Sequence, residues 1–525
     1  MTRLAGAMLA ALLAAGLAGG WIAARARASF TDYQSPFARD ERSRDTAPPL
    51  ARPVVFVLVD GLRLDASRAM PFLGTLRRRG ADLACRVGSP SLSLPGRGVI
   101  MSGAWSEIHG QLLNFKPRPL AVESLFESAR RHGLRTALAA DPKVQTLFAP
   151  HVDERREWPP ESLVEGRPLA SYLSDPPKAI DAAIRLLQDR RPDLLAIDLV
   201  TTDQAAHDWG GASAEYRAVV QETDRALQRL AAALDLERSV LVVTSDHGHV
   251  DRGGHGGDEP AVMSVPLVLA GHGVRAGVTG EARQIDVAPT LAAILGVPIP
   301  ASSQGDILDV LDGDDAARAE RRRVLQAQRE RADHAYVERL AGSGTATASR
   351  TARLTAESAA RRVRAVVMAA APIAMLAVGL IVGGARVAGP GVLLGAGGAL
   401  VNVGLRPLAG ISPSLSALNK DEALPRLLAV DMALAALIVV VVAIVAGAWS
   451  RRQGIDVRPG ERLLLSALAA VAFVTPLVAT LAEAYWKTGL VMTWALPDMR
   501  TMLGVYYDAL ALCAVGLAAH NASAS

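Results

Sequence analysis

Cysteine, aromatic residues and net charge are all scarce in this sequence. The 525 residues include two cysteines, Cys85 and Cys513, which excludes a fold held together by a framework of disulfides. Aromatic residues make up 4% of the chain, and the formal net charge is only +4. The basic residues do not interleave with aromatic ones to form a binding groove. We therefore expect no nucleic acid binding.

Long apolar runs are present, and they lie at the two ends of the chain. The first covers residues 4–23 and is long enough to cross a bilayer. We interpret residues 1–29 as an N-terminal membrane anchor. The alternative is a secretory signal segment, because the small residues Ala26 and Ala28 flank Arg27 in a pattern that resembles a cleavage site.

The C-terminal region, residues 363–525, predicts a transmembrane bundle of four or five helices. One candidate span, 389–409, is rich in glycine and contains Asn402 and Arg406, so it either crosses or re-enters the membrane. The other candidate spans are 364–385, 426–448, 463–485 and 500–519.

Charge in the short loops predicts the orientation of these spans. Four arginines follow the span 426–448 and indicate a cytoplasmic loop: Arg451, Arg452, Arg458 and Arg462. Counting back through three crossings places residues 30–360 on the extracytoplasmic side of an integral membrane protein. If 389–409 does not cross, this region lies inside instead. The Arg-rich stretch within 313–362, predicted to be a helical linker, counts against the outside orientation.

Residues 53–312, after a polar linker at 30–52, predict an α/β domain in which short apolar strands alternate with amphipathic helices. The expected strands are Val54–Val59, Thr136–Ala140, Leu194–Leu199, Val240–Thr244 and Val265–Ala270. The expected helices are Met70–Arg79, Ala121–His132, Ala179–Arg190 and Ala214–Leu236. Nearly continuous Val, Ile and Leu in the strands indicates a parallel-rich sheet with helices on both faces. Ligands of such sheets bind beyond the carboxyl ends of the strands.

Acidic residues and histidines follow several of these strands. Asp203 and His207 have the spacing D-x-x-x-H, which places both side chains on one face of a helix. Each of these residues alone has an ordinary explanation as a turn cap, a helix surface residue or part of a loop. Together, carboxylates and imidazoles suit zinc, with manganese as an alternative. The predicted metal ligands are Asp60, Asp203, His207, Asp246, His247 and His255.

A serine, Ser93, lies in the segment SLSLPGRGVIMSG before a predicted helix at 98–103, where it is either a helix cap or a nucleophile. The ordered segments VDGLR, SLSLPGRGVIMSG, DxxxH, SDHGH, and GGHGG followed by VPLVLAG span residues 53–310. This series resembles the alkaline phosphatase superfamily, and within it the type I phosphodiesterase/nucleotide pyrophosphatase group and the GPI ethanolamine phosphate transferases.

The resemblance implies an alkaline-phosphatase-like fold and two divalent metal ions, most simply zinc. Asp60, Asp246, His247 and Ser93 are expected to bind one metal, and Asp203, His207 and His255 the other. Ser93 is expected to form a phospho-serine intermediate with a phosphoester substrate. Asn114 lies where phosphodiesterases of this group place an asparagine that donates to a phosphate oxygen.

The sequence departs from these relatives at two positions. Ser93 and Gly96 stand where the phosphodiesterases usually have Thr and Asn, and Arg97 stands where the ethanolamine phosphate transferases have His. Arg97 is either a bidentate clamp for phosphate oxygens or a residue held in salt bridges.

Three functions fit this pattern. The first is a membrane-anchored phosphodiesterase or alcohol-phosphate transferase that acts on a lipid-linked or nucleotide phosphodiester. The second is a serine-type sulfatase, because Ser93-x-Pro95-x-Arg97 also matches the sulfatase signature. The third is a transporter or sensor with a degenerate phosphatase-like domain, for which Asp431, Glu483 and Asp508 are candidate intramembrane residues.

Overall fold

The computed structural model describes residues 46–313 apart from Phe115, the stretch 373–381, and isolated positions elsewhere. The chain divides into two compact units, residues 31–350 and residues 1–30 with 351–525. Nearly all of the transmembrane segments predicted above, and most of the linker 313–362, lie outside the described residues. Among the residues that are described, no helix is both long enough and apolar enough to span a membrane.

An eight-stranded sheet forms the centre of the described domain, in the order β4-β3-β5-β1-β6-β7-β2-β8. Its strands are β1 Val54–Val59, β2 Ala81–Arg86, β3 Thr136–Ala140, β4 Glu154–Glu157, β5 Leu194–Leu199, β6 Val240–Thr244, β7 Ser264–Gly271 and β8 Val278–Arg283. All neighbouring strands pair in parallel except β7, which is antiparallel to both β6 and β2. The predicted mixed α/β, parallel-rich fold is therefore confirmed.

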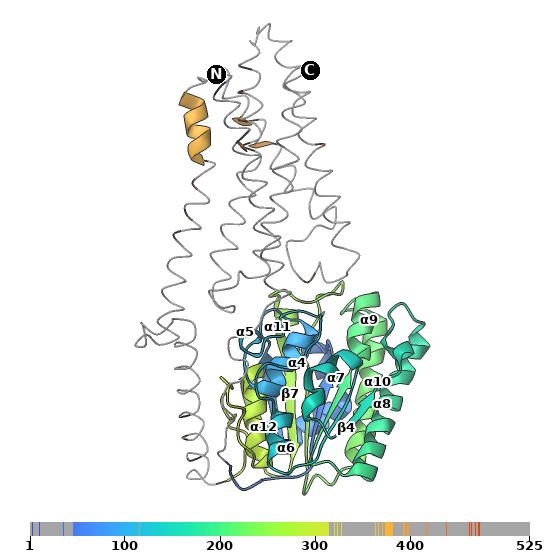
Figure 1. The fold of residues 1–525 in the computed structure, drawn as a ribbon. Helices are drawn as coiled ribbons and strands as arrows, with labels where there is room; N and C mark the ends of the chain where they lie inside the picture. The colour runs from blue at the N-terminus through green and yellow to red at the C-terminus, as the bar shows by residue number, and fades with distance from the viewer. Residues whose placement is uncertain are drawn as a thin grey trace. The chain divides into compact units, whose positions relative to one another are not determined.

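The helices connect and cover these strands. They are α2 Leu64–Arg68, α3 Pro71–Arg79, α4 Ser93–Ser102, α5 Ser106–His109, α6 Leu125–Arg131, α7 Pro142–Phe148, α8 Leu169–Arg190, α9 Thr201–Trp209, α10 Ala214–Ala232, α11 Pro260–Met263 and α12 Val287–Leu295. Short 3-10 turns add η1 Ala149–His151, η2 Pro160–Leu163 and η3 Gln284–Asp286. In Figure 1, α8 and α10 lie to one side of the sheet and α6 and α12 to the other.

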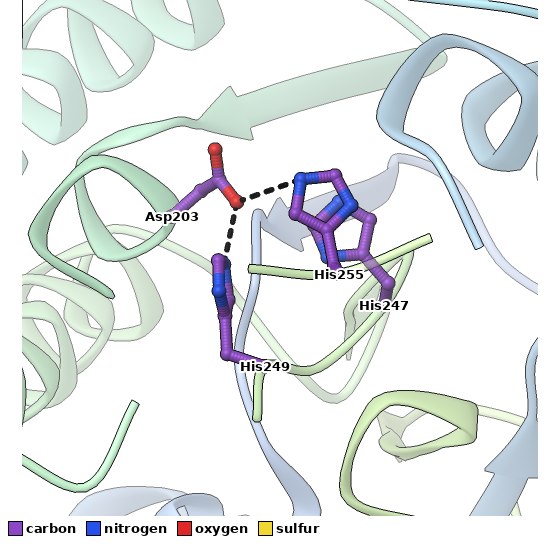
Figure 2. A group of neighbouring side chains, drawn as sticks. All are labelled: Asp203, His247, His249 and His255. Carbon is purple, nitrogen blue, oxygen red and sulfur yellow. Dashed lines mark hydrogen bonds and ion pairs between the residues drawn. The ribbon is translucent and has the colours of Figure 1, made fainter. Parts of the chain in front are cut away.

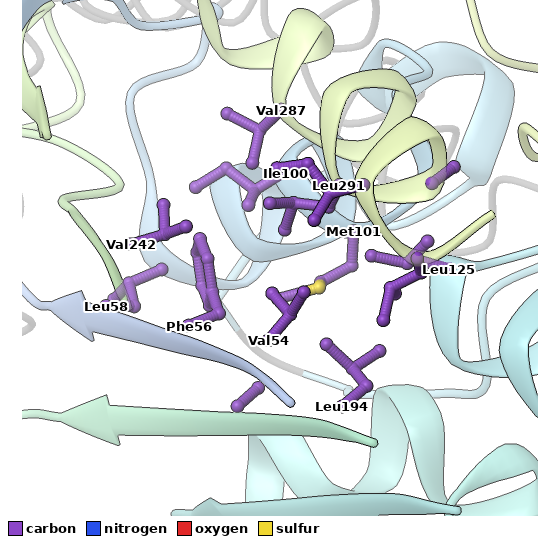
Figure 3. Close-up of a cluster of buried hydrophobic side chains, with 14 of the residues drawn as sticks. Val54, Phe56, Leu58, Ile100, Met101, Leu125, Leu194, Val242, Val287 and Leu291 are labelled. Atoms are coloured by element: carbon purple, nitrogen blue, oxygen red, sulfur yellow. The ribbon is translucent and has the colours of Figure 1, made fainter. Parts of the chain in front are cut away.

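Two hydrophobic cores explain these layers. Alternate residues of β1 point to opposite faces, and all six are buried. Phe56 and Leu58 pack against α4, α6, α7 and α12 (Figure 3), whereas Val55 and Val57 pack against α3, α8, α9 and α10. Burial on both faces is the reason that the central strands read as continuous apolar runs.

The remaining differences from the sequence-based expectation have physical causes. Three strands were missed: β4 is a charged edge strand, and β2 and β8 lack a continuous apolar run. Helix α8 begins at Leu169, ten residues before the expected start at Ala179, and it includes Pro176 and Pro177, which usually interrupt a helix.

Candidate metal centre and active site

Three predicted ligands meet at the carboxyl ends of two neighbouring strands. Asp60 follows β1 and Asp246-His247 follow β6, and these strands are parallel neighbours that end at the same edge of the sheet. His247 Nε2 lies 3.4 Å from Asp60 Oδ1 and 3.4 Å from Asp246 Oδ2, and all three side chains are buried. We call Asp60, Asp246 and His247 the strand-end group.

A second set of side chains comes from a helix and a loop. Asp203 and His207 lie one turn apart on α9, which follows β5, with His207 Nε2 3.4 Å from Asp203 Oδ2. From the loop after β6, His249 Nε2 and His255 Nε2 lie 2.6 and 3.6 Å from Asp203 Oδ1 (Figure 2). We call Asp203, His207, His249 and His255 the loop group.

The two groups are contiguous. The rings of His247 and His255 stack at a centroid distance of 3.6 Å and an interplanar angle of 10°. Ligand atoms of Asp203, His247, His249 and His255 all lie within 4.8 Å of one another, as do those of the strand-end group. The structure thus brings the six predicted ligands into one place, and His247 belongs to both sets that could hold a metal ion.

The protonation of two histidines fits this use. The Nδ1 atoms of His247 and His255 lie 3.2 and 2.9 Å from the carbonyl oxygens of Gly248 and Ser91. A carbonyl oxygen only accepts, so each Nδ1 carries the proton and each Nε2 presents a lone pair. Asp60 Oδ1 is buried and has no hydrogen-bond partner within the described domain. These donors face one another and suit a divalent metal with nitrogen and oxygen ligands.

Burial sets the ionisation of the site. It raises the pKa of Asp60, an effect that the neighbouring Arg97 opposes. Burial acts in the same way on Asp203, but His207 and His249 outweigh it and hold the pKa of Asp203 well below its usual value. Burial lowers the pKa of His255 well below that of a free histidine. His255 is therefore neutral at pH 7, the state in which imidazole binds metal.

Ser93 is the first residue of α4, after the N-cap residue Leu92. Its hydroxyl is therefore not a helix cap, which rules out that alternative. Ser93 Oγ lies 3.1 Å from His247 Nε2. Helix α4 approaches the strand-end group closely because Gly96 has no side chain: a Cβ there would lie 3.1 Å from Asp246 Cβ. The helix N-terminus also favours negative charge at this hydroxyl.

Asn114 flanks the same hydroxyl. Its Oδ1 accepts a hydrogen bond of 2.9 Å from the Leu94 amide, and this fixes the orientation of the side-chain amide. Asn114 Nδ2 then faces Ser93 Oγ at 3.4 Å. An N–H donor beside the hydroxyl is placed to meet an oxygen of a group that binds to Ser93.

Ser91, two residues earlier, has a different role. Its hydroxyl donates to the Gly257 carbonyl at 2.8 Å and accepts from the Gly256 amide at 3.0 Å, and the side chain is buried. Both bonds hold the glycine-rich loop, so Ser91 is structural and not a nucleophile.

Arg97 is placed differently from the phosphate clamp that we considered. Its guanidinium donates to Asp246 at 2.7 Å, to Asp60 at 2.5 Å and to Asp198 at 2.8 Å. The side chain is only 4% exposed and lies behind the carboxylates. Burial opposes its charge, but the three carboxylates raise the pKa of Arg97 well above its usual value. Arg97 is thus held in salt bridges, one of the two alternatives that the sequence left open, and it neutralises the strand-end carboxylates.

Sequence reasoning missed two residues of this site. His249 is the second histidine of the SDHGH segment. We quoted this segment but gave His249 no role of its own, although a second histidine so soon after the strand was a signal. Asp198 lies inside the otherwise apolar strand β5, and a carboxylate in a fully buried strand needs a partner. Its partner is Arg97, which the sequence does not reveal.

Comparison with known proteins shows what the described domain is similar to. The family model described as type I phosphodiesterase / nucleotide pyrophosphatase matches residues 54–259, the region that contains every residue discussed above. The human GPI ethanolamine phosphate transferase 2 catalytic subunit is 26% identical over 286 residues, which is 50% of this chain and 28% of the relative. These similarities support the assignment of the described domain to the alkaline phosphatase superfamily.

Two further relatives show the same partial similarity. Human GPI ethanolamine phosphate transferase 1 is 23% identical over 325 residues, which cover 52% of this chain and 34% of the relative. The 2,3-bisphosphoglycerate-independent phosphoglycerate mutase of Ruegeria pomeroyi is 27% identical over 207 residues, which cover 37% of this chain and 40% of the relative. The matched region thus spans well under half of each of these relatives.

Solved structures similar to this chain include alkaline phosphatase PafA, with a TM-score of 0.42 and 13% identity over 51% of this chain and 100% of that chain. Murine ectonucleotide pyrophosphatase/phosphodiesterase 5 has a TM-score of 0.40 and 13% identity over 47% of this chain and 96% of that chain.

Proposed function

We propose that this chain is a membrane-anchored, two-metal phosphodiesterase or alcohol-phosphate transferase that acts through a phospho-serine intermediate. The observation that carries the proposal is the position of Ser93. Its hydroxyl lies 3.1 Å from His247 Nε2, at the N-terminus of α4 and in the cluster that contains the six predicted metal ligands. The match to the phosphodiesterase family model supports the same reaction class.

Asp60, Asp246, His247 and Ser93 would hold one divalent metal, and Asp203, His207 and His255 the other. Zinc fits the mixture of imidazole and carboxylate, with manganese as the alternative. Two bound metals supply electrostatic stabilisation to the attacking and leaving oxygens of an in-line displacement and lower the pKa of the serine hydroxyl.

The residues of the chain carry out the following steps. The Ser93 hydroxyl loses its proton to solvent water, and its Oγ forms a bond to phosphorus while the bond from phosphorus to the leaving alcohol oxygen breaks. The leaving oxygen takes up a proton from solvent water. Asn114 Nδ2 donates to a non-bridging phosphate oxygen, which positions the phosphorus in line with Ser93 Oγ. Water or an acceptor alcohol then attacks the phosphorus and releases Ser93.

The apolar segments at the two ends of the sequence support membrane anchoring, with the catalytic domain on the extracytoplasmic side as the charge pattern predicts. A membrane anchor suits a lipid-linked phosphodiester, and the similarity to GPI ethanolamine phosphate transferases points in the same direction. A nucleotide phosphodiester is the alternative substrate.

The test is a comparison of Ser93→Ala and Ser93→Thr in the full chain, purified in detergent with zinc. With bis-nitrophenyl phosphate, the unchanged chain should release a burst of one nitrophenol for each active site before steady turnover. Ser93→Ala should abolish the burst and lower turnover by roughly 10³-fold or more while both metals remain bound. Ser93→Thr keeps the hydroxyl and should retain measurable turnover. Normal turnover in Ser93→Ala would sink the proposal.

Two further measurements refine the reaction class. Adding an acceptor alcohol such as ethanolamine or glycerol should divert product from the monoester to a new diester if the enzyme is a transferase, and leave the product unchanged if it is a hydrolase. Hydrolysis of a nitrophenyl sulfate in preference to the phosphodiester would instead favour the sulfatase alternative.

A further inference from the structure

His249 is a histidine of the site to which the reaction proposed above gives no role. It is fully buried, and both of its ring nitrogens have partners. Its Nδ1 lies 3.0 Å from the backbone nitrogen of Gly254, and its Nε2 lies 2.6 Å from Asp203 Oδ1 (Figure 2). His249 therefore connects a metal-ligand carboxylate to the loop that carries His255.

The two contacts determine which nitrogen carries the proton. The Gly254 amide can only donate, so Nδ1 of His249 must be the acceptor. In a neutral imidazole the proton then lies on Nε2, which donates it to the Asp203 carboxylate. His247 and His255 have the opposite arrangement, because their Nδ1 atoms donate to carbonyl oxygens and their Nε2 atoms present lone pairs. His249 thus offers no lone pair to a metal, although it lies among the ligands.

We propose that His249 is a positioning residue, not a metal ligand: it orients the Asp203 carboxylate through Nε2–H and holds the loop 250–256 through Nδ1. This inference rests on the proposed function, because the orientation of Asp203 matters only if Asp203 binds a metal. A carboxylate with one oxygen held by a donor presents its other oxygen in a fixed direction, and such partners commonly tune metal affinity.

Two glycines give His249 its place. A Cβ on Gly61, which has a φ of +68°, would lie 2.8 Å from His249 Nε2 and 2.9 Å from Asp203 Cα. A Cβ on Gly211 would lie 2.8 Å from His249 Cβ. The backbone at Gly61 therefore lies against the imidazole, and the backbone at Gly211 lies against the Cβ of His249. The ring cannot turn to present Nε2 elsewhere without displacing that backbone.

Two substitutions separate the two contacts. The side chain of Asn places its Oδ1 near the position of Nδ1, so His249→Asn keeps the acceptor for Gly254 and loses the donor to Asp203. The side chain of Gln places its Nε2 near the ring Nε2, so His249→Gln keeps the donor to Asp203.

The measurement is zinc affinity and stoichiometry in the full chain, by competition with a chelator. His249→Asn should weaken zinc binding at the site that contains Asp203 by roughly 10- to 100-fold, and His249→Gln should stay within about 3-fold of the unchanged chain. Both should still bind as many zinc ions as the unchanged chain. Loss of one whole zinc equivalent in both variants would show that His249 is itself a ligand and overturn the proposal, as would unchanged affinity in His249→Asn.

A second measurement does not depend on metal or activity. Long-range proton–nitrogen NMR of the histidine-labelled, metal-stripped chain reports which ring nitrogen carries the proton, with the His249 signal assigned by its loss in His249→Gln. We expect the proton on Nε2 for His249 and on Nδ1 for His247 and His255. A proton on Nδ1 of His249 would overturn the proposal. Failure of the unchanged chain to bind zinc at all would instead overturn the proposed function and leave this proton assignment standing.

Discussion

The strand-end group and the loop group hold similar side chains by different means. Asp60 and Asp246 are each fixed by the end of a central parallel strand, and the buried guanidinium of Arg97 neutralises both. Asp203 and His255 come from a helix and a glycine-rich loop, and the group holds them through hydrogen bonds to His249 and to the Ser91 carbonyl. One group is positioned by the sheet and balanced by a cation, and the other is positioned by hydrogen bonds of its histidines, in which His249 donates to Asp203 and His255 donates to the Ser91 carbonyl.

This difference predicts which kind of substitution should disrupt each group. Adjacent strands in a buried sheet leave little freedom for the strand-end group, so its weakness is charge. The loop group contains a single carboxylate, so its weakness is the geometry of a loop that depends on several glycines. The following four predictions test this division, from the largest expected effect to the smallest.

Asp246→Asn should have the largest effect, because Asp246 lies in the strand-end group next to Ser93. We expect loss of one zinc equivalent, measured by elemental analysis, and a fall in turnover of at least about 10³-fold, or roughly 4 kcal/mol. Asp203→Asn should also lose one zinc but retain more of the initial burst, because the strand-end group and Ser93 remain intact. Equal loss of the burst in both variants would contradict the prediction that the strand-end group affects the reaction of Ser93 more than the loop group does.

Arg97→Met should destabilise the domain strongly. It leaves the carboxylates of Asp60, Asp198 and Asp246 buried without their cation, and removing one partner of a buried ion pair costs about 4 kcal/mol. Urea unfolding followed by tryptophan fluorescence measures the loss. The control is Arg86→Met at an exposed position of β2. Saturating zinc should recover part of the stability of Arg97→Met, and a loss no greater than that of the control would contradict the charge-balance role.

Gly253→Ala should disturb the loop group alone. Gly253 has a φ of +88°, and a Cβ there would lie 2.3 Å from the Ala206 carbonyl oxygen in α9. We expect the free energy of unfolding in urea to fall by about 3 kcal/mol because of the combined backbone strain and clash. We also expect weaker binding of one zinc ion. Gly133→Ala is the matched control, since its φ is +77° with nothing within 4 Å of a Cβ, and it should cost only about 1 kcal/mol. Similar losses in the two variants would mean that the loop adapts.

His109→Gln should produce the smallest effect, and one that depends on pH. His109 is buried against Gly98 of α4, and burial lowers its pKa to about 3 from an ordinary value of 6.5. Because the folded pKa is depressed, its stabilising contribution is complete above pH 6.5 and is lost as the pH falls toward 3. The loss at pH 5 amounts to about 2 kcal/mol. Urea unfolding at pH 7 and pH 5 should show a smaller acid sensitivity in His109→Gln than in the unchanged chain; an equal sensitivity would refute the assignment.

The sequence predicted the strand-end group better than the loop group. The central strands β1, β5 and β6 are continuous apolar runs, so their ends, and with them Asp60 and Asp246, could be placed from periodicity alone. Charged or interrupted strands such as β4 and β2 gave no such signal. The antiparallel direction of β7 was equally invisible, because an apolar run carries no information about its direction.

Individual contacts were harder to predict than positions. The contact between Asp198 and Arg97 forms because α4 packs on the face of the sheet to which Asp198 of β5 points. The two residues are far apart in the sequence. The proton position on His249 depends on one backbone amide of the loop, Gly254. Both features arise from tertiary contacts between segments that have no local pattern in common.

Ser91 links the assembly of the two groups. Its hydroxyl and carbonyl fasten Gly256, Gly257 and His255, and two residues later the same segment presents Ser93. The segment that presents Ser93 therefore also fixes the position of His255. A substitution that alters the contacts of Ser91 with the glycine-rich loop should also alter the position of Ser93. We therefore expect the two segments to vary together among homologues.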